Sequence, residues 1–119
     1  DEVIGPAGPT TSSRMDKYSD VMIKNFGIMG MIGKAERGSE ALQIIKKNKV
    51  IYFIAVGGAA YLISQAIKSS KLIAFPELGM EAMYEFEVEN MPVTLAVNTK
   101  GESLHEQGVK KWSEVLRKD

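Results

Sequence analysis

The 119-residue chain carries fifteen basic and fifteen acidic residues and no cysteine, and 45% of its residues are hydrophobic. Its size predicts one modest core in a single domain. The balanced charge argues against nucleic acid or an anionic membrane as a partner, and no apolar run approaches the roughly 18 residues of a membrane span. Without cysteine, the chain has no disulfide, no catalytic thiolate and no sulfur ligands for zinc or an iron–sulfur cluster, which points to the cytoplasm.

The N-terminal part predicts a loop, a helix and a strand in that order. Residues 1–11 are rich in glycine and proline, which favours an extended loop. Hydroxyl residues suited to helix capping follow, and apolar residues then recur at spacings of three and four, so that a helix is predicted over about 13–26. Gly27 is expected to end this helix. The apolar run 28–32 is too short for a helix and predicts a buried strand, with a loop over 33–38.

The middle of the chain predicts two strand–helix alternations. A second helix is expected to begin at Ser39, with lysines at its C-terminal end that offset the helix dipole. Residues 50–56 are continuously apolar, which is typical of a central strand covered on both faces. A helix over 59–68 and a strand over 71–75 follow, and parallel pairing is expected between the strands of this alternation.

The pattern changes in the C-terminal third. After a turn at 76–79, residues 83–88 and 93–98 predict two strands that form a hairpin or an edge pair. Residues 103–118 predict a last helix with one apolar stripe that contains Trp112. The seven methionines and the tryptophan are expected to fill the core. The predicted fold class is therefore α/β, with a mixed sheet and flanking helices.

The first candidate site is a run of hydroxyl residues at the start of the first predicted helix. Exposed N–H groups at a helix N-terminus favour a carboxylate or phosphate, and the guanidinium of Arg14 can grip such an anion with two parallel hydrogen bonds. Ordinary helix capping beside a surface arginine is the other interpretation, and residue types alone leave both open. The hydroxyl run consists of Thr10, Thr11, Ser12 and Ser13.

Other candidates carry weaker signals. Lys34 follows a predicted strand in a glycine-flanked loop, where ligand-binding side chains are common, although a solvated lysine is the alternative. The glycine pair 57–58 follows the strongest strand but lacks the spacing of a nucleotide-binding loop. His105 has no partners at metal-ligand spacing and is expected at the surface, so no metal site is predicted. Glu77 and Glu81 stay undecided between acid–base chemistry and a solvated turn.

The string Gly-Pro-Thr-Thr-Ser-Ser-Arg-Met-Asp at 8–16 resembles the Gly-Pro-Thr-Thr-x-x-Arg-Met motif of the class I fumarase C-terminal domain and of the matching β subunits, and it is closely similar to that of the L(+)-tartrate dehydratase β subunit. The resemblance implies a swivelling β/β/α domain over residues 1–119 that lacks the family's N-terminal segment. The resemblance continues in order through residues 31–34, 55–60, 76–82 and 88–92.

In that family the β part closes over an α part whose cysteines hold a four-iron four-sulfur (4Fe-4S) cluster. The resemblance therefore implies the β subunit of an iron–sulfur hydro-lyase that reversibly hydrates fumarate to (S)-malate, with a cluster-bearing α subunit, in a heterotetramer of two α and two β subunits. It implies Thr10 as the catalytic base, and Thr11, Arg14 and Lys34 as ligands of the dicarboxylate substrate. The alternatives are an L(+)-tartrate dehydratase β subunit, a non-catalytic assembly subunit and a free-standing dicarboxylate-binding module.

Overall fold

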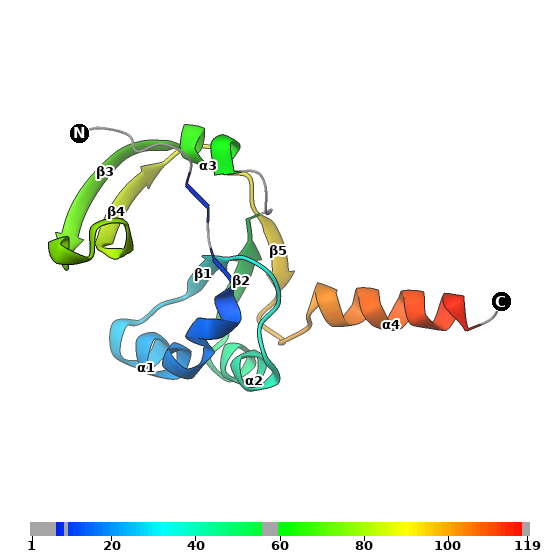
Figure 1. Cartoon of the computed structure of the whole chain (residues 1–119). Helices are drawn as coiled ribbons and strands as arrows, with labels where there is room; N and C mark the ends of the chain where they lie inside the picture. Colours follow the sequence, from blue (N-terminus) through cyan, green and yellow to red (C-terminus); the bar gives the residue numbers. More distant parts are fainter. Residues whose placement is uncertain (1–6, 9, 56–59, 118–119) are drawn as a thin grey trace. The chain divides into compact units, whose positions relative to one another are not determined.

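The structure of the chain is a computed structural model that describes residues 7–8, 10–55 and 60–117. The described residues belong to two compact units (Figure 1). The three-stranded unit falls within residues 9–54 and 93–119, and the hairpin unit falls within residues 1–8 and 55–92. The glycine pair 57–58 lies outside the described residues.

A mixed sheet organises the three-stranded unit. Strand β2 (Ile51–Ile54) lies in the centre, parallel to β1 (Gly30–Gly33) and antiparallel to β5 (Thr94–Val97). Parallel strands need a long crossover connection, and helix α2 (Ser39–Asn48) supplies it between β1 and β2. The central place of β2 confirms the prediction from its continuous apolar run.

The first predicted helix is present, but it begins differently. A 3₁₀ turn, η1 (Ser12–Met15), leads into α1 (Asp16–Phe26), which ends at Gly27 with a left-handed φ of 64° that glycine adopts at little cost. Neither η1 nor α1 has a side-chain cap, so the expected capping by hydroxyl residues is wrong. The Ser12 hydroxyl bonds instead to a distant part of the chain. Helices α1 and α2 lie side by side (Figure 1).

The core of the three-stranded unit lies between α2 and the sheet. Its largest fully buried side chains include those of Ile45 on α2 and Tyr52 on β2, and both are 0% exposed. Burial of such apolar surface is the main term that favours folding. Leu42, Ala96 and Val97 complete this cluster of buried residues.

Several apolar residues that were expected in the core are exposed. Strand β1 lies at the edge of the sheet, and Ile32 within it is 54% exposed, so the predicted burial of run 28–32 is wrong. Helix α4 (Leu104–Leu116) carries the predicted stripe, yet none of its residues is buried and Trp112 is 60% exposed. Met80 is 91% exposed. A periodic pattern shows which residues share a face, but it does not show whether another element covers that face.

An antiparallel strand pair forms most of the hairpin unit. Strand β3 (Ile67–Ala74) pairs with β4 (Met83–Val88), and the short 3₁₀ element η2 (Pro76–Glu81) connects them. Helix α3 (Ala60–Ala66) precedes β3 directly, so the helix ends and the strand begins earlier than the predicted bounds. The buried apolar residues of this unit include Ile63, Ala66 and Ile67.

Two of the predicted strand pairings are wrong. The parallel partner expected for β3 was β2, but β3 pairs antiparallel with β4. The hairpin expected between β4 and β5 is absent from the described pairs, because β5 adds to the sheet of β2. Pro92 lies between β4 and β5, lacks a backbone N–H and favours extended backbone in the residue before it, which opposes a tight reversal there. The fold is nevertheless a mixed α/β fold with a small mixed sheet and flanking helices, as predicted.

The remaining expectations concern single polar residues and the membrane. Glu77 and Glu81 are both exposed on η2. His105, which was expected at the surface, is half-buried, and its Nδ1 atom is buried without a hydrogen-bond partner among the described residues. No described helix has the length and apolar character to cross a bilayer.

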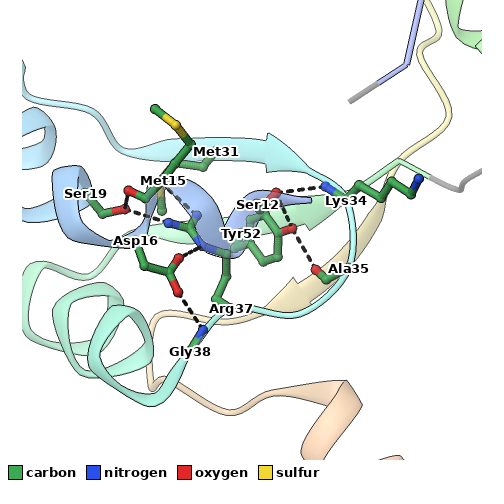
Figure 2. A network of polar contacts seen from close by, with 10 residues as sticks. All are labelled: Ser12, Met15, Asp16, Ser19, Met31, Lys34, Ala35, Arg37, Gly38 and Tyr52. Carbon is green, nitrogen blue, oxygen red and sulfur yellow. Dashed lines mark hydrogen bonds and ion pairs between the residues drawn. The ribbon is translucent and has the colours of Figure 1, made fainter. Parts of the chain in front are cut away.

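A buried ion pair joins α1 to the loop that follows β1 (Figure 2). Arg37 Nε donates to Asp16 Oδ1 at 2.5 Å, and the side chains of Arg37 and Asp16 are 4% and 15% exposed. Arg37 Nη2 also donates to Ser19 Oγ. The second carboxylate oxygen of Asp16 accepts from the amide of Gly38, the residue that precedes α2, at 2.7 Å. One carboxylate therefore connects the start of α1 with the start of α2.

We predict that Arg37→Met lowers the free energy of unfolding by about 3 kcal/mol, because it leaves the largely buried Asp16 carboxylate without its cation. Lys24→Met is the matched control, since Lys24 pairs with Asp20 at 2.7 Å but both side chains are at least 40% exposed. Such a surface pair is expected to contribute less than about 1 kcal/mol. Urea unfolding followed by circular dichroism measures the free energy of unfolding of both variants. Equal losses of stability in the two variants would contradict the assignment of a largely buried pair.

Candidate functional site

The hydroxyl segment at the start of η1 lies beside the end of β1. Thr11 and Lys34 form a parallel bridge, and the amide of Ser12 donates to the carbonyl oxygen of Lys34 at 3.1 Å. Thr10 precedes this bridge in the chain, and Arg14 lies on the 3₁₀ turn that follows it. The fold thus brings Thr11 and Lys34 into backbone contact, with Thr10 and Arg14 nearby in the chain. All four residues are exposed.

Ser12 is the residue of this segment whose role sequence reasoning missed. It is buried, and its Oγ accepts from the amide of Lys34 at 2.9 Å (Figure 2). Tyr52 Oη lies 3.0 Å from Ser12 Oγ and 2.8 Å from the carbonyl oxygen of Ala35. Because a carbonyl only accepts, the Tyr52 hydroxyl donates to Ala35 and the Ser12 hydroxyl in turn donates to Tyr52. The available sequence signal was a tyrosine within the central strand, since a buried tyrosine hydroxyl usually finds a partner.

Gly33 makes this arrangement possible. A Cβ atom on Gly33 would lie 1.9 Å from Ser12 Oγ and 3.0 Å from Tyr52 Oη, so only a residue without a side chain allows the Ser12 hydroxyl to approach. The backbone then turns sharply, because Ala35 adopts a left-handed φ of 63°. This conformation costs an alanine about 1–2 kcal/mol. Lys34 therefore lies between Gly33, where a side chain would clash with Ser12, and Ala35, whose backbone is strained.

A shallow cavity of about 300 Å³ opens beside the hydroxyl segment. Thr10, Thr11 and Ser12 form part of its polar lining, whereas Arg14 and Lys34 do not line it. A volume of this order is at the lower end for small-molecule sites. A larger hollow on the hairpin unit, between β3 and β4, contains none of the predicted site residues. The apolar wall of the smaller cavity is formed by Met15, Tyr18, Met22, Ile28, Met31 and Ile32.

The side chains in the described part of the chain do not fit an iron–sulfur cluster or another metal. The sequence contains no cysteine, which is the usual ligand of such clusters. Within residues 7–8, 10–55 and 60–117, no group of three or more histidine, aspartate and glutamate residues is placed to hold an ion. The polar chemistry of the candidate site is that of hydroxyls, amides and two exposed cations. Such a set suits an anionic ligand.

We predict that Gly33→Ala lowers the free energy of unfolding by about 1–3 kcal/mol, because the added methyl group displaces the buried Ser12 hydroxyl. Gly30→Ala is the control on the same strand, since a Cβ at Gly30 meets no atom within 4 Å. Its expected change is close to zero. Urea denaturation of both variants provides the measurement, and an unchanged midpoint in Gly33→Ala would show that the segment can move away without loss.

Comparisons with known proteins agree with the fold and with the motif. The family described as the fumarase C-terminus matches residues 1–108. The anaerobic class I fumarate hydratase of Escherichia coli (strain K12) is 40% identical over 108 residues, which are 90% of this chain and 20% of that protein. The aerobic class I fumarate hydratase of the same strain is 38% identical over 104 residues, or 87% of this chain and 19% of that protein. The chain thus spans about a fifth of the length of these fumarate hydratases.

A separate subunit is also among the relatives. The putative L(+)-tartrate dehydratase subunit beta of Methanocaldococcus jannaschii is 38% identical over 112 residues, which are 92% of this chain and 57% of that subunit. The match to the fumarase C-terminus covers most of the chain, including the hydroxyl segment and Lys34. It confirms the resemblance and the swivelling β/β/α fold that the resemblance implies. The chain belongs to the family of fumarase C-terminal domains found in class I fumarate hydratases.

Proposed function

We propose that the chain is the β part of an iron–sulfur hydro-lyase that reversibly hydrates fumarate to (S)-malate. The observation that carries this proposal is the backbone bridge between Thr11 and Lys34, which places the hydroxyl segment beside a cation-bearing strand end. The 40% identity to a class I fumarate hydratase supports the substrate. We further propose that residues 1–119 act as one fumarase-type domain.

The proposed roles follow from the charge that develops during the reaction. Removal of a proton next to a carboxylate places negative charge on that carboxylate, and fixed cations aimed at it lower the barrier. Arg14 and Lys34 are proposed to bind substrate carboxylates, and both are exposed and therefore accessible to a ligand. Thr11 is proposed to contact the substrate beside them.

Thr10 is proposed as the catalytic base. A threonine hydroxyl is a poor proton acceptor at its ordinary pKa, so it needs an adjacent cation or a proton relay. Lys34 is the candidate for that cation, because it forms a backbone bridge with Thr11, the residue that follows Thr10. Thr10 is exposed and lines the cavity beside the segment, where a small dicarboxylate has room to approach.

We propose that a second subunit completes this site. The donor set of the chain does not fit the 4Fe-4S cluster, so we propose that a cluster-bearing α subunit holds it. A heterotetramer of two α and two β subunits is the proposed assembly. The beta-subunit name of the Methanocaldococcus relative supports a partner of this kind.

Tartrate dehydration is the second candidate function. It is favoured by the 38% identity to a tartrate dehydratase beta subunit. The aligned region covers 57% of that subunit, compared with about a fifth of the two fumarate hydratases. The retention of Thr10, Arg14 and Lys34 argues against a non-catalytic assembly subunit. A free-standing dicarboxylate-binding module would bind its ligand tightly without a partner, whereas a shared site would not.

Anaerobic hydration of fumarate by the chain, by its cluster-bearing partner and by their mixture tests the proposal. We expect turnover only in the mixture, because each component supplies part of the site. L(+)-tartrate is assayed in parallel, and turnover of tartrate alone would assign the second candidate. No turnover of either acid with an intact cluster would indicate a non-catalytic subunit. Calorimetric titration of fumarate into the isolated chain tests for a binding module, which would bind fumarate tightly without a partner.

Arg14→Ala is predicted to lower kcat/KM of the assembled enzyme by roughly 100-fold or more, because a carboxylate loses a charged, two-pronged donor. The urea midpoint of the chain should not change, since Arg14 is exposed. Arg117→Ala removes another exposed arginine, at the end of α4, and serves as the control with expected full activity. Unchanged turnover in Arg14→Ala would remove this residue from the substrate site.

A further inference from the structure

We propose that Tyr52 is a positioning residue, which holds Lys34 in place relative to Thr11 through hydrogen bonds to Ser12 and Ala35. The inference rests on the proposed function in one respect, namely that Lys34 binds substrate. Tyr52 itself is fully buried, so it acts on the site through other residues.

The ring of Tyr52 is held rigidly from several sides. It is 0% exposed on the central strand β2 and belongs to the buried cluster that includes Leu42 and Ile45. The Arg37 guanidinium, which is itself fixed by Asp16, lies 5.2 Å from the centre of the ring. A close-packed aromatic ring on a central strand has little freedom, so its hydroxyl oxygen occupies a well-defined point.

The Tyr52 hydroxyl lies between Ser12, on the hydroxyl segment, and Ala35, in the loop that follows β1 (Figure 2). It is bonded to the carbonyl of Ala35 at 2.8 Å and to Ser12 Oγ at 3.0 Å. Ser12 in turn accepts from the amide of Lys34 through its hydroxyl and donates to the carbonyl of Lys34 through its amide. Both backbone polar groups of Lys34 are thus bound to a residue that Tyr52 holds.

The hydrogen bond from Tyr52 also holds the strained backbone at Ala35. A left-handed alanine persists where surrounding contacts hold it, and Ala35 has a φ of 63° directly after Lys34. The hydrogen bond from Tyr52 to the Ala35 carbonyl is such a contact. Without it, the bend can relax towards an ordinary conformation, and the direction in which the Lys34 side chain leaves the backbone then changes.

Tyr52→Phe tests the proposal, because it removes one oxygen and keeps the ring. Tyr84→Phe is the matched control, since the Tyr84 hydroxyl donates to the carbonyl of Gly79 at 3.0 Å within the hairpin unit. In the isolated chain, hydrogen exchange followed by NMR should show the Lys34 amide exchanging about tenfold faster in Tyr52→Phe, and unchanged in Tyr84→Phe. The amide of the core residue Ile45 serves as the internal reference and should keep its rate.

The assembled enzyme provides the second measurement. Tyr52→Phe and Ser12→Ala should each lower kcat/KM for fumarate hydration by about tenfold at a temperature well below unfolding, and the double variant by little more, because both break the same chain of hydrogen bonds. Independent roles would give a loss of about a hundredfold for the double variant, which contradicts the proposal. Tyr84→Phe should keep the kcat/KM of the unmodified protein.

The two measurements separate failure of this inference from failure of the proposed function. An unchanged Lys34 exchange rate in Tyr52→Phe overturns the positioning role, as does equal acceleration at Ile45, which shows general destabilisation. Faster exchange at Lys34 with unchanged kcat/KM also overturns it. Faster exchange confined to the Lys34 region in a protein without hydratase activity supports the positioning of Lys34 and refutes the function proposed for it.

Discussion

The hydrogen bond between the Ser12 hydroxyl and the amide of Lys34 joins two segments that are 22 residues apart in the chain. A buried hydroxyl lowers stability unless its hydrogen bonds are made, and this one is satisfied on both sides by Lys34 and Tyr52. The bond requires a glycine at position 33 and places Lys34 beside Thr11. The candidate site takes this form because that bond holds Lys34 against the hydroxyl segment, next to the backbone bridge between Thr11 and Lys34.

The ion pair between Arg37 and Asp16 contacts the residues that hold the candidate site in place. Its carboxylate connects the start of α1 to the amide of Gly38, and its guanidinium lies over the ring of Tyr52. The Arg37 side chain of this pair is buried and that of Asp16 is largely buried, whereas Arg14 and Lys34 are exposed. Loss of either member of the pair would leave the other with little solvent and without its charged partner, which lowers stability, whereas exposed cations remain available to a ligand.

Local patterns predicted the elements well and their partners poorly. The helices around 13–26, from 39 and over 103–118 are present within a few residues, because apolar spacing and end signals act within one or two turns. The pairing of β3 with β4, and of β5 with β2, depends on contacts between distant segments and was predicted incorrectly. The prediction of burial for the run 28–32 was wrong for the same reason, because the run is apolar and yet Ile32 is 54% exposed.

The sequence by itself determined the family, because the motif at 8–16 and the stretches that follow it are specific strings, and it determined the absence of cysteine ligands. It also indicated Thr11 and Lys34 as candidates, but as separate residues. Only the tertiary structure decided that Thr11 and Lys34 lie side by side, and that Ser12 bonds across the fold rather than capping a helix. It also decided that the Tyr52 hydroxyl bonds to Ser12 and Ala35. Hydrogen bonds between residues 22 and 40 positions apart leave no trace in local periodicity, because they depend on how the strands and helices pack.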